Sequence, residues 1–314
     1  MGKLNTGKIV VAGGAGFIGS HLCDHLLAKG EKVVCVDNLV TGNRGNVAAL
    51  LGSKNFSFME QDVCEEFTVS GDVRQVYNLA SPASPVDYLE KPIETLKAGS
   101  AGVKNLLEIA RKHNAKFLFA STSEVYGNPL EHPQKESYWG NVNPVGPRGC
   151  YDEAKRFGEA LCVAFSNVYG VDAKIARIFN TYGPRMREND GRVIPNFIEQ
   201  ALGNRPLTVY CDGGQTRSFC YVSDMVSGLH SLMNSPEKGP INLGAPVETS
   251  ILGLAEKIIR LSKSGSKIVY RKLPIDDPER RLPDISLAKS RLSWNPKVPL
   301  DEGLKLAISY FQKI

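Results

Sequence analysis

The chain has 314 residues, 42% of them hydrophobic and 23% charged, which is ordinary for a globular protein of one large domain or two closely joined ones. Its net charge of +5 is small and dispersed, so no nucleic-acid partner is expected. Seven scattered cysteines without a CxxC pair favour reduced thiols and no metal site. The absence of a long apolar stretch or a signal-peptide pattern predicts no membrane partner and a cytoplasmic location, unless a targeting segment has been removed.

Short β-branched runs alternate with longer amphipathic segments through the first 180 residues. Apolar strands separated by helices of this length need crossover connections, which produce a parallel sheet covered on both faces. The pattern therefore predicts a Rossmann-type, doubly wound α/β fold. The expected strands are 8–13, 32–38, 56–63, 73–80, 116–122 and 173–180, and the expected helices are 17–29, 93–113 and 151–168.

The rhythm changes after residue 181, where Gly, Pro and charged residues precede short strands such as 207–213 and helices such as 250–263. This pattern predicts a smaller, interwoven C-terminal domain. We expect a first domain at 1–178, a second at 179–314, and a return to the first domain at about 212–235. A ligand cleft should lie between the two.

Three glycines, Gly13, Gly16 and Gly19, follow the first strand directly and open the first helix. Glycines at this spacing allow a tight turn, a close approach of the backbone to a pyrophosphate, and an anion site at the helix start. Asp37 ends the second strand, where a carboxylate can bind a ribose diol and repels a 2′-phosphate. NAD is therefore the expected cofactor, and Arg44 keeps NADP as an alternative.

A second acidic residue, Asp62, closes another strand at the same end of the sheet. Its carboxylate could accept a hydrogen bond from an adenine amino group. The alternative is a helix N-cap, because Asp is a common capping residue.

A phenol and an ammonium lie four residues apart at Tyr151 and Lys155, and hence on one helical face. Thr122 ends a neighbouring strand and offers a hydroxyl. A nearby cation and a nicotinamide charge should favour the phenolate and lower the pKa of Tyr151. The alternative for such a pair is an ordinary surface contact.

Several long stretches resemble the extended short-chain dehydrogenases/reductases that modify nucleotide sugars, and among them the UDP-glucuronic acid decarboxylases (UDP-xylose synthases), over nearly the whole chain. The glycine turn and YxxxK mark only the superfamily. The run ending in CYDEAKR is specific to the decarboxylases. The stretches are GGAGFIGSHL (13–22), STSEVYG (121–127), HPQKESYWGNVNPVGPRGCYDEAKR (132–156), RIFNTYGPRM (177–186) and QTRSFCYVSDMV (215–226).

The resemblance implies an NAD-dependent decarboxylation of UDP-glucuronate to UDP-xylose by a homodimer. The implied catalytic residues are Thr122, Ser123, Glu124, Tyr151, Lys155 and Arg281. The implied cofactor-binding residues are Gly13, Gly16, Phe17, Ile18, Gly19, Asp37, Asn38, Thr41, Gly42, Asp62, Val63, Leu79, Ser81, Tyr151 and Lys155. The implied substrate-binding residues are Ser84, Tyr88, Asn180, Arg192, Thr208, Tyr210, Arg217 and Arg281.

Alternatives remain open at this point. A decarboxylase could release a 4-keto pentose and leave NADH behind, or the chain could be a 4-epimerase or a 4,6-dehydratase. A non-catalytic NAD-sensing module is a further class, since such folds host many functions. The chain also departs from the family pattern at Ala12, Ala98 and Gly99, where Thr, Thr and Asn are usual.

Overall fold

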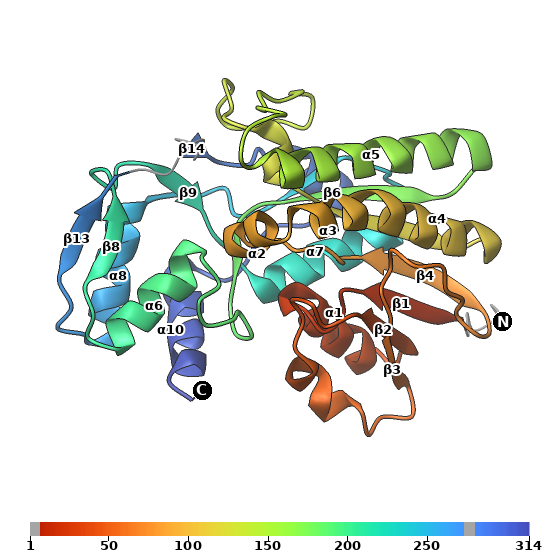
Figure 1. The fold of residues 1–314 in the computed structure, drawn as a ribbon, viewed down its shortest axis with the longest axis horizontal. Coiled ribbons are helices and arrows are strands. Elements are labelled where there is room, and N and C mark those ends of the chain that lie inside the picture. The colour runs from red at the N-terminus through yellow and green to blue at the C-terminus, as the bar shows by residue number, and fades with distance from the viewer. Residues whose placement is uncertain (1–6, 273–279, 314) are drawn as a thin grey trace.

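A seven-stranded parallel sheet forms the centre of the computed structural model, which describes residues 7–272 and 280–313 (Figure 1). The strand order β3-β2-β1-β4-β5-β6-β11 is that of a doubly wound dinucleotide-binding sheet, so the predicted fold class is confirmed. The strands are β1 (Lys8–Ala12), β2 (Val33–Asp37), β3 (Phe56–Glu60), β4 (Val73–Asn78), β5 (Lys116–Thr122), β6 (Ala173–Ile178) and β11 (Ile241–Leu243).

Helices cover both faces of this sheet because its strands are apolar on both sides. In β1, Ile9 and Val11 belong to one buried cluster while Val10 and Ala12 belong to another. Helices α1 and α7 pack on the first side, and α4 and α5 on the second. Their bounds are α1 (Phe17–Ala28), α4 (Val103–Lys112), α5 (Gly149–Tyr169) and α7 (Val222–Asn234), with η1 (Arg44–Leu50), α2 (Pro85–Glu90), α3 (Pro92–Lys97) and η3 (Ser123–Tyr126) between them.

A smaller lobe stands beside the carboxyl ends of the strands and carries most of the C-terminal half (Figure 1). It holds the parallel pair β8–β13 and the strands β12, β9 and β14. Its elements are α6 (Val193–Leu202), β8 (Leu207–Tyr210), β9 (Thr216–Ser218), β12 (Glu248–Ser250), α8 (Ile251–Ser262), β13 (Ile268–Arg271), β14 (Arg280–Arg281) and α10 (Leu300–Phe311), with β7 (Thr181–Tyr182), β10 (Cys220–Tyr221) and α9 (Ser286–Leu292) joining it to the sheet.

The chain crosses back to the sheet after entering this lobe. Helix α7 packs on α1, and β11 pairs with β6 in parallel register from Ile241 opposite Ala176 to Leu243 opposite Ile178. We propose to keep the division at residues 178 and 179, with α7 and β11 assigned to the first domain.

The segment predicted as one helix at 93–113 is interrupted. A π-helical turn, η2 (Ala98–Gly102), separates α3 from α4. At Gly99 the backbone lies so close to α5 that an added Cβ would be 2.6 Å from the Cβ of Ala154 and 2.8 Å from its carbonyl oxygen. Because Ala154 lies between Tyr151 and Lys155, this contact braces the helix that carries the YxxxK pair.

We expect Gly99→Ala to lower the free energy of unfolding by about 1–3 kcal/mol, because overpacking at this contact outweighs the better helix propensity of alanine. Urea unfolding measures the change. Gly265→Ala is the matched control, since an added Cβ there has nothing within 4 Å. A Gly99→Ala protein as stable as the control would contradict the close contact.

Two findings concern membrane-spanning helices and the cysteines. No helix in residues 7–272 and 280–313 combines the length and apolarity needed to cross a membrane. All seven cysteines are free thiols, and Cys23, Cys35, Cys162 and Cys220 are buried. The cysteines therefore contribute packing rather than cross-links.

Candidate active site

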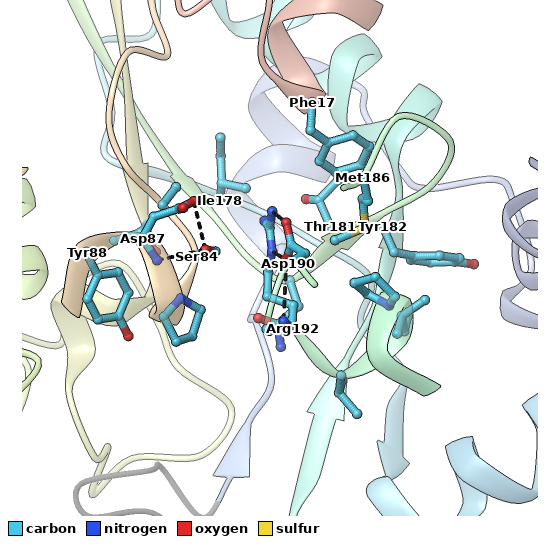
Figure 2. Close-up of a pocket in the computed structure, with 18 of the residues that line it drawn as sticks. Phe17, Ser84, Asp87, Tyr88, Ile178, Thr181, Tyr182, Met186, Asp190 and Arg192 are labelled. Carbon is cyan, nitrogen blue, oxygen red and sulfur yellow. Dashed lines mark hydrogen bonds and ion pairs between the residues drawn. The ribbon is translucent and has the colours of Figure 1, made fainter. Parts of the chain in front are cut away.

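A cavity of about 820 Å³ receives side chains from both the Rossmann sheet and the smaller lobe (Figure 2). Residues from the glycine turn, the end of β5, the start of α5 and the segment before α6 line it together. The predicted site residues in its wall are Gly13, Gly16, Phe17, Ile18, Gly19, Thr41, Leu79, Ser81, Ser84, Tyr88, Thr122, Ser123, Glu124, Tyr151, Lys155, Asn180, Arg192, Thr208, Tyr210 and Arg217. Those outside the wall are Asp37, Asn38, Gly42, Asp62, Val63 and Arg281.

The glycine turn is shaped for close approach of an anion. Gly13 has φ +75°, and an added Cβ would lie 2.7 Å from the backbone of Leu79 and Ala80. A Cβ on Gly19 would overlap the carbonyl oxygen of Gly13. Gly16 is the N-cap of α1 and leaves the first N–H groups of that helix without a side-chain cap. These features fit the pyrophosphate of a dinucleotide.

Asp37 holds this turn in place from the end of β2. Its carboxylate accepts hydrogen bonds from the N–H groups of Ala15 and Leu39, each at 2.9 Å. Burial raises its pKa, although these backbone bonds oppose the shift. Gly42 allows the next loop to approach, since an added Cβ would lie 2.6 Å from Asp37 Oδ1. The contact of Asp37 with a ribose diol stays a prediction.

Asp62 organises a turn instead of capping a helix. Its Oδ1 accepts from the N–H of Cys64 at 2.8 Å, and its Oδ2 accepts from Asn38 Nδ2 at 3.1 Å. Val63 is buried among the apolar residues under α4. Arg44 lies 4.0 Å from the Glu60 carboxylate at the surface. Two of the predicted cofactor-binding residues, Asn38 and Asp62, therefore bond to one another.

The three residues of the proposed proton-transfer group meet in the cavity wall. Thr122 hydrogen-bonds the Tyr151 phenol, and the Lys155 ammonium donates to the carbonyl oxygen of Ala120 at 2.9 Å. Tyr88 stacks on Tyr151 with the ring centroids 4.9 Å apart and the planes 10° apart. All these side chains are buried, so a substrate hydroxyl at Tyr151 would meet a phenol shielded from bulk water.

The predicted lowering of the Tyr151 pKa counted the charge of a bound nicotinamide among its causes, and the protein without cofactor shows a raised pKa. Burial raises the pKa of Tyr151 to about 12, and the hydrogen bond to Thr122 opposes this shift only in part. Burial also lowers the pKa of Lys155 to about 8. The positive charge of a bound nicotinamide would act against this effect of burial and favour the phenolate.

A cluster of charged groups lies where η3 meets the start of α5. Glu124 Oε2 forms ion pairs with Arg148 and, at 3.3 Å, with Arg281. Burial of Glu124 would raise its pKa, but Arg281, Arg148 and Arg217 outweigh burial and lower the pKa to about 2. Glu124 is thus an anion at neutral pH and cannot serve as a general acid there.

Arg148 and four other charged residues of the cavity wall were missed by the sequence reasoning. Arg148 stands three residues before Tyr151, which was the available signal. The others are Asp87, Arg185, Arg187 and Asp190. Long-range ion pairs of this kind leave no pattern in a single sequence.

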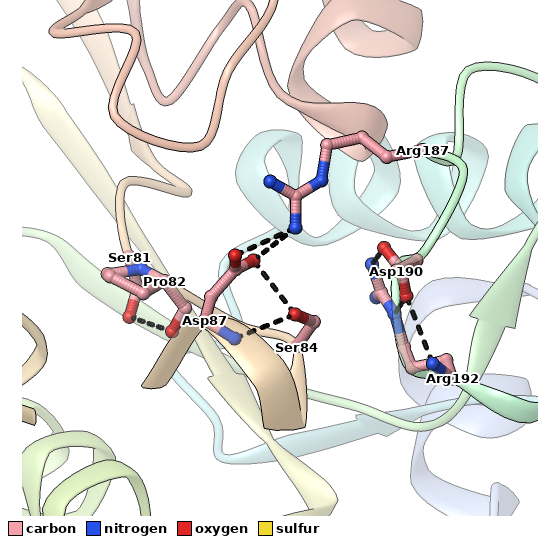
Figure 3. Close-up of polar contacts among 7 residues, drawn as sticks. All are labelled: Ser81, Pro82, Ser84, Asp87, Arg187, Asp190 and Arg192. Carbon is pink, nitrogen blue, oxygen red and sulfur yellow. Dashed lines mark hydrogen bonds and ion pairs between the residues drawn. The ribbon is translucent and has the colours of Figure 1, made fainter. Parts of the chain in front are cut away.

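Figure 3 shows how two of these carboxylates hold arginines at the cavity. Arg187 Nη2 lies 2.8 Å and 2.7 Å from the two carboxylate oxygens of Asp87. Asp87 also accepts from Ser84 Oγ at 2.8 Å and donates its N–H to that oxygen at 3.2 Å. Asp190 pairs with Arg192. The Ser84 hydroxyl, predicted to contact the sugar, is therefore oriented by Asp87.

The segment 183–192 bridges the two lobes. Its Pro184 carbonyl lies 2.9 Å from His21 Nε2, and Arg185 forms an ion pair with Asp24 at 2.7 Å, both on α1. Arg187 binds Asp87 on α2, as described above. The segment therefore contacts both the helix that follows the glycine turn and the helix that carries Tyr88, and Figure 3 shows the contact of Arg187 with Asp87.

The far end of the cavity is built from the smaller lobe. Thr208 on β8 bonds Gln200 of α6, with its N–H 3.0 Å from Gln200 Oε1. Arg217 lies on β9, and its guanidinium donates to the carbonyl of Thr216 at 2.9 Å. Asn180 follows β6 and lies in the cavity wall. Arginine beside a strand edge suits a nucleotide diphosphate.

Fold and site together define a dinucleotide-dependent enzyme acting on a hydroxyl group, and comparison with known families agrees. Residues 9–244 match the model of the NAD dependent epimerase/dehydratase family, and the chain belongs to that family. NAD is its cofactor.

Within that family the chain groups with the UDP-glucuronic acid decarboxylases. UDP-glucuronic acid decarboxylase 1 of Xenopus tropicalis is 52% identical over 98% of this chain and 72% of its own length. The Arabidopsis thaliana protein of the same name is 50% identical over 97% of this chain and 70% of its own length. The recognition made from the motifs is confirmed.

Solved structures show the same architecture. UDP-glucose 4-epimerase of Thermotoga maritima, with UDP-glucose, is 30% identical with a TM-score of 0.89, over 98% of this chain and 99% of that one. UDP-glucuronic acid 4-epimerase of Bacillus cereus, in complex with UDP-glucuronic acid and NAD, is 29% identical with a TM-score of 0.86, over the same shares of the two chains.

Proposed function

We propose that this chain decarboxylates UDP-glucuronate to UDP-xylose with a recycled NAD. The observation that carries the proposal is the meeting of Thr122, Tyr151 and Lys155 with Glu124 and Arg148 in one cavity beside the glycine turn. Relatives about 50% identical over nearly the whole chain carry the decarboxylase name. The glycine turn and α1 would hold the pyrophosphate.

The carboxylate of glucuronate cannot leave as CO2 until the neighbouring C4 has been oxidised to a ketone, which can accept the electrons. When bound, NAD⁺ accepts the C4 hydride and later returns it, and its nicotinamide charge favours the Tyr151 phenolate. Tyr151 removes the C4 hydroxyl proton, and Lys155 holds the phenolate and the ribose. The resulting C4 ketone accepts the electrons released as CO2 leaves.

Two donors then stabilise the negative charge on the C4 oxygen. Tyr151, now protonated, and Thr122 both hydrogen-bond that oxygen while C5 takes up a proton from water. Tyr151 finally returns its proton to the C4 oxygen as the alcohol is re-formed. Ser123 takes the position where related dehydratases carry an acid, and its hydroxyl is too weak an acid to expel water, which favours loss of CO2 over dehydration.

The smaller lobe binds the UDP part of the substrate. Asn180, Arg192 and Arg217 face the diphosphate, and Thr208 and Tyr210 border the uridine. Ser84 and Tyr88 contact the sugar from the opposite wall. The support is that all of these side chains line one continuous cavity with Tyr151.

The direct test is to incubate the protein with NAD⁺ and UDP-glucuronate labelled with deuterium at C4. We expect CO2 and UDP-xylose, with the deuterium passing to the coenzyme and back. Accumulating NADH with a 4-keto pentose would favour release of the intermediate. An epimerised or dehydrated sugar, or tight NAD binding without turnover of any UDP-sugar, would exclude a decarboxylase.

A homodimer built on α3 and α5 is part of this proposal. Ile93, Leu96, Phe157 and Val168 are large apolar residues on these two helices with 40–69% of their surface exposed. Phe157 and Val168 are eleven residues apart and share one face of α5. An apolar face of this kind on a charged protein favours a self-association surface.

We expect the double variant Phe157→Glu/Val168→Glu to be monomeric by light scattering, because four carboxylates would be buried in the dimer. Leu306→Glu is the matched control and should stay dimeric, because Leu306 lies on α10 and is 47% exposed. A native protein that is monomeric, or a double variant that still dimerises, would place the interface elsewhere.

The cytoplasm remains the proposed location. Seven free thiols suit a reducing compartment. Fractionation of the native host with antibody detection tests it.

A further inference from the structure

The proposed substrate differs from other UDP-hexoses by one charged group, the carboxylate on C5. That group is next to C4, whose hydroxyl meets Tyr151 in the proposed function on which this inference rests. A cation that recognises the carboxylate must therefore lie in the cavity wall near Tyr151. Arg148, Arg192 and Arg217 line the cavity, and the proposed function gives the last two to the diphosphate. Arg281 lies outside the wall and pairs with Glu124.

Arg281 is committed to the protein itself. Its side chain is 1% exposed and lies behind η3 rather than in the cavity wall. Its guanidinium donates to the carbonyl oxygens of Ser123 and, at 3.0 Å, of Gly127, and it pairs with Glu124 at 3.3 Å. These contacts hold η3 and the Glu124 carboxylate in position, so Arg281 acts as a positioning residue.

Arg148, unlike Arg281, lines the cavity. It lines the cavity at the N-cap of the 21-residue helix α5, three residues before Tyr151. Its guanidinium carbon lies 6.0 Å from the centre of the Tyr88 ring, and that ring stacks on Tyr151. The partial positive charge at the start of α5 adds to the attraction for an anion.

Glu124 limits how strongly Arg148 can bind. Glu124 Oε2 already forms an ion pair with Arg148, and Glu124 itself lines the cavity. A substrate carboxylate must therefore share the guanidinium with an internal carboxylate. A shared cation orients the group without neutralising it fully, and partial neutralisation keeps the ground state from being stabilised against loss of CO2.

We propose that Arg148 is the residue that recognises the sugar carboxylate, and that Glu124 and Arg281 set the strength of that contact. The site thereby selects UDP-uronates over neutral UDP-hexoses. The assignment differs from the family resemblance, which implied that Arg281 binds the substrate, because it gives recognition of the carboxylate to Arg148.

The test compares two ligands that differ only at C6, UDP-glucuronate and UDP-glucose, by calorimetry on NAD-loaded protein in a Tyr151→Phe background that blocks turnover. Arg148→Gln should weaken UDP-glucuronate binding about ten- to hundredfold and change UDP-glucose binding less than about twofold. Arg148→Lys should fall between, because it keeps the charge and loses the planar fork. Arg291→Gln, an exposed arginine on α9, is the matched control.

Equal losses for the two ligands, or an unchanged preference for UDP-glucuronate in both Arg148 variants, would overturn the assignment. A lost preference in Arg281→Gln with Arg148→Gln unaffected would return the role to Arg281. Selective loss in Arg148→Gln supports it even if the native protein releases no CO2, so failure of the proposed reaction is seen separately.

Discussion

Tyr151→Phe is expected to lower kcat by about 10²–10⁴-fold while leaving NAD bound. The variant keeps the ring that stacks on Tyr88 but removes the only phenol hydrogen-bonded to Thr122 among the described residues. Proton removal from the C4 hydroxyl then has no base. Steady-state release of CO2 gives the rate, and quenching of protein fluorescence gives NAD binding.

The control for this variant is Tyr169→Phe at the far end of the same helix, where the side chain is 55% exposed. It should match the native protein. Activity of Tyr151→Phe within tenfold of native would show that another group removes the proton, and lost NAD binding would show that the variant damages the site more broadly.

Glu124→Gln is expected to retain NAD binding and to lose turnover by roughly a hundredfold, with a lower KM for UDP-glucuronate. The amide leaves the charge of Arg148 unopposed, so the substrate carboxylate is bound more tightly before CO2 leaves. A drop in kcat with a drop in KM is the signature of a stabilised ground state. Initial rates over a range of substrate concentrations separate the two constants.

Glu153→Gln is the matched control, since this glutamate lies on α5 and pairs with Arg156 at 3.5 Å at the surface. It should leave both constants unchanged. Full activity of Glu124→Gln would remove Glu124 from the mechanism. A raised KM at unchanged kcat would mean that Glu124 merely helps to bind the sugar.

The parts of the fold that follow local spacing were predictable. Alternating strands and helices identify the sheet, and the glycine turn and YxxxK identify two regions of the cavity wall because each depends on neighbours a few residues apart. The π-turn at Ala98–Gly102 was not predictable, because it depends on the contact of Gly99 with a helix some fifty residues away in sequence.

The charge arrangement of the site could not be derived from sequence either. Asp87 and Arg187 are 100 residues apart and Glu124 and Arg281 are 157 apart, so only the folded chain brings each pair together. The burial of Tyr151 could not be derived from sequence for a related reason. Spacing revealed the neighbouring cation but not the burial, and burial is the larger effect.

The bridging segment 183–192 has a consequence for movement of the smaller lobe. Its contacts with His21, Asp24 and Asp87 mean that the smaller lobe cannot swing outward without breaking them or drawing α1 and α2 along. An outward movement of the smaller lobe would therefore disturb the helix that follows the glycine turn, where the pyrophosphate of the coenzyme is proposed to bind.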